Sequence, residues 1–373
     1  MREQALVTGG AGFIGSHLVD ALLARGYRVR VLDNLLEQAH PTGQAQFLSP
    51  EAELLVGDLR DRAAVDQALN GVSLVFHQGG MVGNGQSMYD IHRYIDVNSS
   101  GTAMLLEAMV ARRDQFRRLV MASSMVVYGD GAYSCPQHGP IARATRPIER
   151  LRARQWEPLC ATCGTEVTAI ATNEDHPMRP TSTYGISKRD QEELSLVIGK
   201  AYKLPTIALR YLNAYGQRQA LSNPYTGVAA IMITRLLNGK QPVVFEDGLQ
   251  RRDLVHVGDI VSANLAAADA DERADYQAFN IGGGRSITIH GLASQLAKQL
   301  GKDIEPAITG EYRDGDIRHC FADISRARTF LQWEARTPIE TGIADLVSWA
   351  THERPEDRTE RANAELRAKG LIW

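Results

Sequence analysis

Tyr184 and Lys188 stand four residues apart in the run YGISK, inside a stretch with the apolar spacing of a helix. Residues four apart share a helix face, where the ammonium group lowers the pKa of the phenol and favours a base that can take a hydroxyl proton. Ser124 follows the apolar run FRRLVMASS and could hold the same hydroxyl group by a hydrogen bond. Alone, the tyrosine–lysine pair also fits a half-buried tyrosine beside a solvated lysine. Together, the three side chains predict proton transfer on a substrate alcohol.

A second chemical signal is the glycine-rich run VTGGAGFIGSHL, in which Gly9, Gly12 and Gly15 are spaced by three residues. The run lies between a predicted strand and a predicted helix. Glycines there permit a tight turn and a close backbone approach to a pyrophosphate, which the helix N-terminus attracts. A glycine triplet alone also fits an ordinary strand-to-helix turn.

Asp33 strengthens the interpretation as a cofactor site, because it closes the next strand, YRVRVLD, 18 residues after Gly15. An acid at this place accepts a hydrogen bond from the ribose 2′-hydroxyl and repels a 2′-phosphate. With Asn34 beside it, Asp33 predicts NAD as the cofactor in preference to NADP. Asp58, in VGDLRD, is placed to meet the adenine amine, and Asp61 is a candidate N-cap for the following helix.

Two cysteine-bearing motifs form the third signal. Cys135 and His138 stand in CPQHG, and Cys160 and Cys163 stand in CATCG, with 21 residues between His138 and Cys160. Soft thiolates and an imidazole at paired spacing suit a tetrahedral structural zinc site with no open position. A disulfide and loose thiols with occasional metal are the alternatives. Cys320 stands apart and is expected to be an ordinary buried or pocket-lining thiol.

The elements that position these residues alternate between short apolar runs and longer helical patterns from residue 4 onward. This alternation predicts an α/β fold: a Rossmann, doubly wound parallel sheet with helices on both faces. We expect an NAD-binding domain over 1–212 and a smaller, mainly substrate-binding domain over 213–373, with 255–281 returning to the first domain.

The alternation lapses between Val127 and Thr181, and 131–176 is therefore interpreted as a loop insertion that carries the cysteine motifs. Within 131–176, Pro136, Pro140, Pro147 and Pro158 interrupt the chain, and the run IARATRPIERLRAR contains five arginines. We expect these arginines to form a solvated face, as charge runs generally do.

The composition of the chain excludes some classes of protein and of binding partner. Of 373 residues, 44% are hydrophobic and 23% charged, and the formal net charge is -3, which excludes a disordered tail and a basic nucleic-acid binder. No apolar run reaches the roughly 18 to 20 residues of a membrane span, and no signal-peptide core precedes the first strand. We expect a cytoplasmic enzyme with a small-molecule ligand.

With these motifs in place, the chain resembles the extended short-chain dehydrogenase/reductase family, in its nucleotide-sugar epimerase branch. The resemblance covers nearly the whole chain outside the insertion. It implies a catalytic set of Ser124, Tyr184 and Lys188. It implies an NAD-binding set of Gly9, Gly12, Phe13, Ile14, Gly15, Asp33, Asn34, Asp58, Leu59, Gln78, Gly79, Gly80, Asn98, Tyr184 and Lys188. It implies a set that binds the nucleotide sugar, Ser124, Met125, Asn213, Arg252, Arg313 and Asp316.

Two departures qualify the resemblance. The family's HLAA segment is HQGG here, which we expect to alter the pocket beside the nicotinamide ribose. Sugar 4,6-dehydratases carry Asp-Glu just after the catalytic serine or threonine, and sugar-acid decarboxylases keep the glutamate. Met125 and Val126 occupy these places and cannot transfer a proton. Reversible oxidation at the sugar C4 therefore remains, with a related dehydratase or reductase, or a non-catalytic NAD-binding sensor, as alternatives.

The stretches VGNGQSMYDIHRYIDVN, ALSNPYTGVAAI and FEDGLQRRD look like those of dTDP-L-rhamnose 4-epimerases, which also resemble this chain in having a cysteine-bearing insertion. Fold and triad do not fix the sugar, so both the sugar and its nucleotide, dTDP or UDP, stay open. The resemblance further implies a homodimer, formed through the helices at GTAMLLEAMVARR and SKRDQEELSLVIGKAYK. The insertion joins the two catalytic segments, and we expect it to form a flap beside the sugar pocket.

Overall fold

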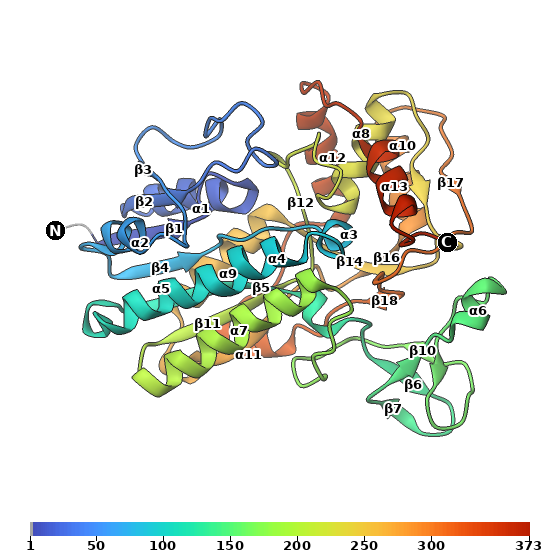
Figure 1. The fold of residues 1–373 in the computed structure, drawn as a ribbon, viewed down its shortest axis with the longest axis horizontal. Coiled ribbons are helices and arrows are strands. Elements are labelled where there is room, and N and C mark those ends of the chain that lie inside the picture. Colours follow the sequence, from blue (N-terminus) through green and yellow to red (C-terminus); the bar gives the residue numbers. More distant parts are fainter. Residues whose placement is uncertain (1–2) are drawn as a thin grey trace.

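Strands from residues 4–281 lie side by side in one parallel sheet, in the order β15-β11-β5-β4-β1-β2-β3 (Figure 1). The structure is a computed structural model and describes residues 3–373. β1 lies between β2 and β4, so the chain reverses direction across the sheet there. In a doubly wound sheet, a ligand binds outside the carboxyl ends of the strands at this point.

The strands of the structure are β1 Gln4–Thr8, β2 Arg28–Asp33, β3 Glu53–Val56, β4 Leu74–His77, β5 Arg118–Ser124, β6 Tyr133–Cys135, β7 Gly139–Ile141, β8 Ala144–Thr145, β9 Leu159–Cys160, β10 Thr168–Ala169, β11 Thr206–Tyr211, β12 Asn213–Tyr215, β13 Val243–Val244, β14 Arg251–His256, β15 Gln277–Ile281, β16 Ser286–Thr288, β17 Ala307–Ile308 and β18 His319–Cys320. The α-helices are α1 Phe13–Ala24, α2 Arg62–Leu69, α3 Asn84–Ser87, α4 Ile91–Tyr94, α5 Gly101–Val110, α6 Ile148–Arg152, α7 Thr183–Tyr202, α8 Val228–Leu237, α9 Val257–Asp269, α10 Ile289–Gln299, α11 Ser325–Leu331, α12 Ile339–Ala350 and α13 Thr359–Ala368.

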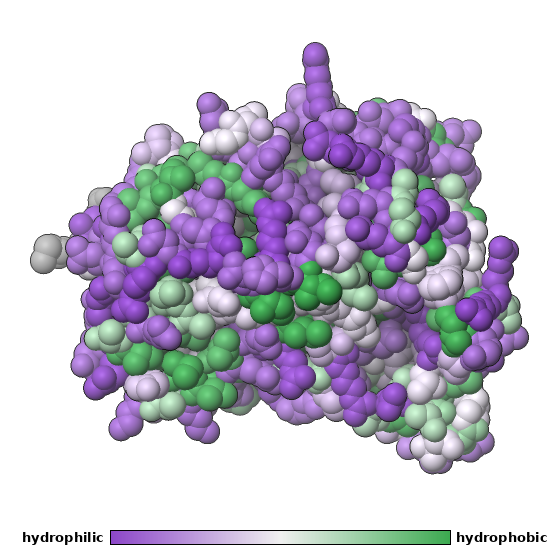
Figure 2. Space-filling model, viewed as in Figure 1, coloured by the Kyte–Doolittle hydropathy of each residue, from purple (hydrophilic) through white to green (hydrophobic). Residues whose placement is uncertain are grey.

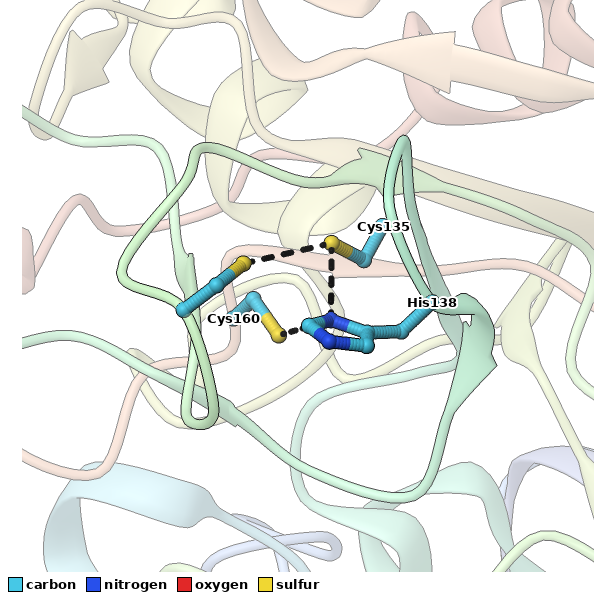
Figure 3. A group of neighbouring side chains, drawn as sticks. Cys135, His138 and Cys160 are labelled. Carbon is cyan, nitrogen blue, oxygen red and sulfur yellow. Dashed lines mark hydrogen bonds between the residues drawn. The ribbon is translucent and has the colours of Figure 1, made fainter.

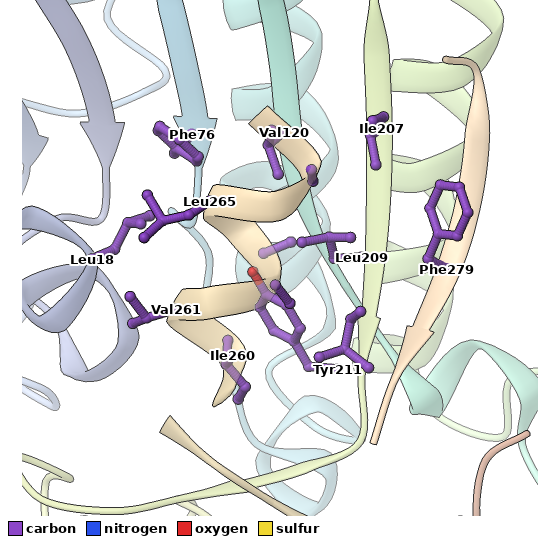
Figure 4. Close-up of a cluster of buried hydrophobic side chains, with 14 of the residues drawn as sticks. Leu18, Phe76, Val120, Ile207, Leu209, Tyr211, Ile260, Val261, Leu265 and Phe279 are labelled. Carbon is purple, nitrogen blue, oxygen red and sulfur yellow. The ribbon is translucent and has the colours of Figure 1, made fainter. Parts of the chain in front are cut away.

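Helices cover both faces of the parallel sheet. One core cluster packs α1, α9 and α11 against the sheet, with Leu18, Phe76 and Leu265 among its buried side chains (Figure 4). A second cluster on the other face joins α2 and α5 to the strands through residues such as Val65 and Leu105. Among these helices, the sequence pattern predicts α1, α2 and α5, because each buries an apolar stripe of period 3.6. Within residues 3–373, no helix has both the length and the apolar character that a membrane crossing requires.

The second half of the chain builds a smaller layer beside the carboxyl ends of the sheet. β12, β14, β16 and β18 form a mixed sheet, and α8, α10 and α12 pack together through a separate core that includes Ile233, Leu296 and Leu346. The chain then returns to the large sheet, where α9 packs against the strands and β15 pairs with β11.

The insertion forms a small lobe that protrudes below the smaller layer (Figure 1). β10, β6 and β7 make one antiparallel sheet and β8 pairs with β9. The arginine-rich run contains α6, and Arg143, Arg152 and Arg154 are exposed, as the charge run predicts. For Arg146 the prediction is wrong, because its guanidinium pairs with the buried Glu246.

Candidate functional site

The loop after β1 has the shape that the glycine spacing predicts. Gly9 has φ +66°, and a Cβ there would lie 2.8 Å from the Cα of Gly79. A Cβ at Gly15 would lie 2.2 Å from the carbonyl oxygen of Gly9, so the first turn of α1 can pack on the loop only without a side chain. Gly12 is the N-cap of α1 and has no side-chain cap, which leaves the amides of the first helical turn available to an anion.

Asp33 at the end of β2 secures this loop. One carboxylate oxygen accepts from the main-chain N–H of Ala11 at 3.0 Å, and the other accepts from that of Leu35 at 2.9 Å. Each oxygen retains a second lone pair, so the carboxylate can still accept from a ribose hydroxyl. The loop that contains Gly9, Gly12 and Gly15, called the glycine cradle below, fits a pyrophosphate. Asp33 fits a ribose that carries no 2′-phosphate.

The predicted adenine-side residues also meet. The side-chain amide of Asn34 donates to Asp58 at 3.0 Å. Hydrogen bonds from the Arg60 side chain hold the pKa of the Asp58 carboxyl well below its ordinary value. Leu59 lies beside Gly79, where its Cδ1 would be 2.8 Å from an added Cβ. Asp61 caps α2 as expected, since its side chain accepts from the N–H of Ala63.

The residues of the HQGG segment, at the end of β4, contact both faces of the sheet: Gln78 contacts one face, and Gly79 and Gly80 contact the other. Gln78 donates to Tyr211 at 3.1 Å and to Asn264 of α9 at 2.9 Å, so its side chain is used on the α9 face. A Cβ at Gly80 would lie 3.1 Å from Oδ1 of Asn98. The two glycines therefore allow the chain to pass closely between Leu59 and Asn98.

Asn98 is fully buried, and its side chain holds this passage in place. Its Oδ1 accepts from the N–H of Met81 at 2.7 Å, and its Nδ2 donates to the carbonyl of Met81 and to Ser187 of α7. Because both polar atoms have partners, the geometry gives Asn98 a positioning role next to the predicted cofactor contacts.

Ser124 and Tyr184 face one another across the site. Ser124 ends β5, and Tyr184 lies in the first turn of α7, whose N-cap Ser182 accepts from the N–H of Gly185. Burial raises the pKa of Tyr184 to about 12, and a hydrogen bond with Ser124 opposes this rise. The Tyr184 ring packs edge-on against Tyr94, with ring centroids 6.2 Å apart. The serine hydroxyl and the phenol can thus hold one substrate hydroxyl between them.

Lys188 lies one turn after Tyr184, as the spacing predicts, and its ammonium donates to the carbonyl of Ala122 in β5. Burial lowers the pKa of Lys188 to about 8, and the charge of Glu192 opposes the shift. The Lys188 ammonium makes this bond to the strand, and its direct effect on the pKa of the phenol stays a prediction. Its contact ties the helix to the strand that carries Ser124.

Sequence reasoning missed a buried polar network beneath these residues. Glu192 accepts from Ser123 at 2.6 Å and pairs with Arg210 of β11 at 2.6 Å, and Arg210 also donates to Tyr128 at 2.7 Å. A charged residue inside the otherwise apolar strand TIALRY was the signal, because a buried arginine needs a carboxylate. The network fixes β5, β11 and α7 relative to one another.

The predicted substrate residues lie in the smaller layer, apart from Ser124 and Met125. The Asn213 Oδ1 is buried and accepts no hydrogen bond from the described residues. Arg313 pairs with Asp316 at 2.9 Å and lies over the ring of Phe245. Met125 is 4% exposed and belongs to the main core, so the geometry gives this side chain a packing role.

Arg252 on β14 is oriented by main-chain carbonyl groups. Its guanidinium donates to the carbonyl oxygens of Arg251 at 2.9 Å and Arg318 at 3.0 Å, and also to that of Ile317. Carbonyls fix the direction of the guanidinium without neutralising its charge. Burial lowers the pKa of Arg252, a cost that an arriving anion offsets. Arg252 therefore suits a phosphate group.

The four predicted metal ligands converge in the insertion (Figure 3). Nδ1 of His138 lies 3.5 Å from Sγ of Cys135 and 3.6 Å from Sγ of Cys160, and the sulfurs of Cys135 and Cys163 are 3.6 Å apart. Tetrahedral zinc with ordinary bond lengths separates nitrogen from sulfur by about 3.6 Å and sulfur from sulfur by about 3.8 Å. All four ligand atoms lie within 4.8 Å of one another, and the cysteines form no disulfide in the described chain. The cluster fits a metal and does not fit a disulfide.

The strand order, the glycine cradle with Asp33, and the Ser124, Tyr184 and Lys188 set define an NAD-dependent enzyme of the extended short-chain dehydrogenase/reductase class. Residues 5–150 and 160–282 match the NAD dependent epimerase/dehydratase family, and the chain belongs to that family. The intervening residues, 151–159, fall within the insertion.

Three relatives illustrate the similarity. The chain is 35% identical to a dTDP-L-rhamnose 4-epimerase of Burkholderia thailandensis, over 94% of this chain and 96% of that protein. A UDP-glucose 4-epimerase of Thermotoga maritima, solved with UDP-glucose, is similar with a TM-score of 0.75 and 30% identity, covering 93% of this chain and 98% of that one. The Thermus thermophilus UDP-glucose 4-epimerase, solved in complex with NAD, has a TM-score of 0.73 and 30% identity, covering 93% of this chain and 98% of that one.

Proposed function

We propose that the protein is an NAD-dependent nucleotide-sugar 4-epimerase. The observation that carries the proposal is the facing pair of Ser124 and Tyr184 beside the glycine cradle, with no acid following the serine. Met125 is buried in the core and Val126 is apolar, so the positions that serve proton transfer in dehydratases are inert. The facing pair is therefore proposed to move the proton of the sugar hydroxyl at C4.

The roles of the residues follow from their positions. Ser124 holds the sugar 4-hydroxyl, and Tyr184 accepts its proton and later returns it. NAD, when bound, supplies a hydride acceptor and donor for C4. The glycine cradle and Asp33 bind the pyrophosphate and a ribose, and Lys188 keeps a positive charge next to them. Arg252 and Arg313 bind the substrate diphosphate and Asp316 its ribose, which makes 213–373 mainly a substrate-binding domain.

For the substrate, we propose a dTDP- or UDP-sugar such as dTDP-L-rhamnose, supported by 35% identity to an epimerase of that name. The test is incubation of the purified protein with a panel of dTDP- and UDP-sugars, with epimer ratios at C4 read by NMR. We expect interconversion without added NAD. Tight NAD binding with no turnover of any sugar would favour a non-catalytic sensor, and loss of water from the sugar would favour a dehydratase.

We also propose that Cys135, His138, Cys160 and Cys163 hold a structural zinc ion. Support comes from the tetrahedral fit of the four ligand atoms and from the small core of the insertion, which consists of Tyr133, Val167 and two of the ligand cysteines. Metal binding supplies folding free energy where a core is small.

Elemental analysis of protein purified without chelator tests this zinc site. We expect about one equivalent of zinc per chain, and loss of zinc together with a lower melting temperature in Cys160→Ser. Cys320→Ser, at a buried cysteine outside the cluster, is the control and should keep its zinc. Less than about a tenth of an equivalent in the wild type would contradict the site.

The insertion is proposed to act as a flap beside the sugar pocket. A cavity of about 290 Å³ lies between insertion residues such as Ile141 and Arg143 and the segments that lead from Ser124 and toward Tyr184, including Tyr128 and Thr181. The insertion thus forms one wall of a space reached from both catalytic segments.

A further inference from the structure

Two charged side chains connect the insertion to the smaller layer. Arg146, just after β8, pairs with Glu246, which is 3% exposed. Glu157, just before β9, accepts from Nε of Arg318 at 3.1 Å, and its second oxygen lies 3.0 Å from Nε2 of His319. The insertion thus contributes a cation, Arg146, that pairs with an anion of the smaller layer. It also contributes an anion, Glu157, that pairs with the cation Arg318. Opposed polarities of this kind fix the position of a docked segment.

Arg318 is the largest fully buried side chain of the described residues. Besides Glu157, its guanidinium pairs with Glu246 at 2.7 Å and with Asp247 at 2.6 Å. Its main-chain N–H donates to Asp130, in the segment that leads from Ser124 into the insertion, at 2.6 Å. A fully buried guanidinium is stable only while its charge is paired, so the position of Arg318 depends on these carboxylates.

The backbone of Arg318 in turn orients Arg252. Arg252 donates to the carbonyl oxygens of Ile317 and Arg318, and β14 pairs in parallel with β18 immediately after them. A shift of residues 317 and 318 therefore turns the guanidinium that is proposed to bind the substrate diphosphate.

The position of the Glu157 side chain depends on whether the insertion is folded. The insertion's strands have two or three residues each, and its apolar cluster contains two of the metal-ligand cysteines. Such short strands need a cross-link to stay in register. Glu157 is three residues before Cys160, so the metal cluster anchors the segment that carries it.

From these contacts we infer that Glu157 is a positioning residue through which the metal-held insertion sets the affinity of the enzyme for the substrate diphosphate. The path runs from Glu157 to Arg318 and from the Arg318 backbone to Arg252. The inference rests on the proposed function, since it assigns a nucleoside diphosphate to Arg252. It makes the insertion part of the machinery for substrate binding.

The test combines Glu157→Gln with removal of zinc by a chelator. In the zinc-loaded protein, Glu157→Gln should weaken dTDP or UDP binding, measured by calorimetry, and raise KM by about 5- to 50-fold while kcat stays within about 2-fold. Zinc removal from the wild type should have the same effect. Zinc removal from Glu157→Gln should weaken binding by less than about 2-fold further, because the coupling is already broken.

A matched control is Glu166→Gln, which removes an ion pair with Arg150 inside the insertion and leaves the contact with the smaller layer intact. It should bind the diphosphates as the wild type does. Trp156 gives a readout that is independent of binding, because it is 8% exposed and adjacent to Glu157. Undocking of the insertion should shift its fluorescence to longer wavelength in Glu157→Gln and not in Glu166→Gln.

Equal diphosphate affinities in the wild type and Glu157→Gln, or additive effects of the substitution and of zinc removal, would overturn the inference alone. If zinc-loaded wild type binds neither dTDP nor UDP, the proposed substrate class fails, and the inference fails with it. Glu157→Asp separates charge from packing: a partial recovery of affinity supports the carboxylate contact, and no recovery in a folded protein contradicts it.

Discussion

The phenol of Tyr184 is the group on which the proposed chemistry depends. Burial raises its pKa to about 12, an effect that the neighbouring Ser124 opposes, so the hydroxyl is protonated at neutral pH in the free protein. A base with so high a pKa works only when its phenolate is stabilised as the substrate loses its proton. We propose that the buried cation of Lys188, which is held one turn away, provides part of that stabilisation.

Tyr184→Phe should therefore lower turnover by about two to four orders of magnitude, because it removes the proton acceptor. The fold should remain, since the ring still packs against Tyr94. Steady-state kinetics and circular dichroism measure the two effects. Tyr202→Phe, at the exposed end of the same helix, should leave turnover unchanged. Near-normal turnover in Tyr184→Phe would exclude the mechanism.

Lys188 gives a prediction for stability against pH. Its pKa is about 8 in the folded protein and 10.5 ordinarily, so below about pH 8 the lysine is charged in both states and the burial cost is complete. Between pH 8 and 10.5 the folded state releases its proton first, and the free energy of unfolding rises with pH by at most about 3 kcal/mol. Lys188→Met should lack this rise, and its turnover should be strongly reduced.

Denaturant unfolding at several pH values measures the difference between the wild type and Lys188→Met. The exposed Lys200 on the same helix supplies the control, because Lys200→Met should keep the wild-type pH dependence. A difference between the wild type and Lys188→Met that stays constant from pH 7 to about 10 would contradict a lowered Lys188 pKa.

At the scale of elements, two glycines at the junction of β1 and α1 have different roles. Gly15 is needed for the packing of α1 on the loop, and we expect Gly12 to be needed for NAD binding. An alanine at Gly15 would place a Cβ 2.2 Å from the Gly9 carbonyl oxygen, whereas at Gly12 the nearest atom would be 3.3 Å away. We expect Gly15→Ala to lower stability by about 1–3 kcal/mol, and Gly12→Ala to weaken NAD binding at nearly unchanged stability. Thermal unfolding and NAD titration measure these effects, and equal melting temperatures for the two variants would refute the distinction.

Periodicity located Rossmann elements such as β1, α1 and β5, because each of them buries an apolar face of adequate length. It failed in the insertion, where β8 and β9 have two residues each and leave no recognisable pattern. The metal ligands could still be predicted from spacing alone. Their convergence confirms the expected cluster, while the identity of the metal stays a proposal.

At the scale of the whole molecule, contacts between segments far apart in the chain could not be predicted from the sequence. Arg318 and Glu157 are separated by 161 positions, and Gln78 and Asn264 by 186. Such pairs are fixed by how layers pack, and local patterns carry no information about them. This is why the prediction of a solvated arginine face failed for Arg146, and why the side chain of Gln78 was expected on the cofactor side.

The face formed by α5 and α7 suggests how two molecules associate. Apolar side chains gather on this side of the molecule (Figure 2), and α7 exposes Ile186 at 45% and Val197 at 65%, which lie three turns apart on the same side of the helix. Exposed apolar residues on one helix face, flanked by charged ones such as Arg189 and Glu193, fit a contact surface with an apolar centre and a polar rim. We propose that α5 and α7 pair with those of a second copy in a four-helix interface.

Light scattering during size exclusion should accordingly give twice the chain mass of 41.0 kDa at micromolar concentration. Val197→Glu should shift the molecule toward the single-chain mass, because two charges would be buried near the symmetry axis without partners. Ile308→Glu is the control, since Ile308 is 50% exposed in β17, on the smaller layer. It should leave the dimer intact. A single-chain mass for the wild type, or an unchanged dimer in Val197→Glu, would show that α7 uses its apolar face elsewhere.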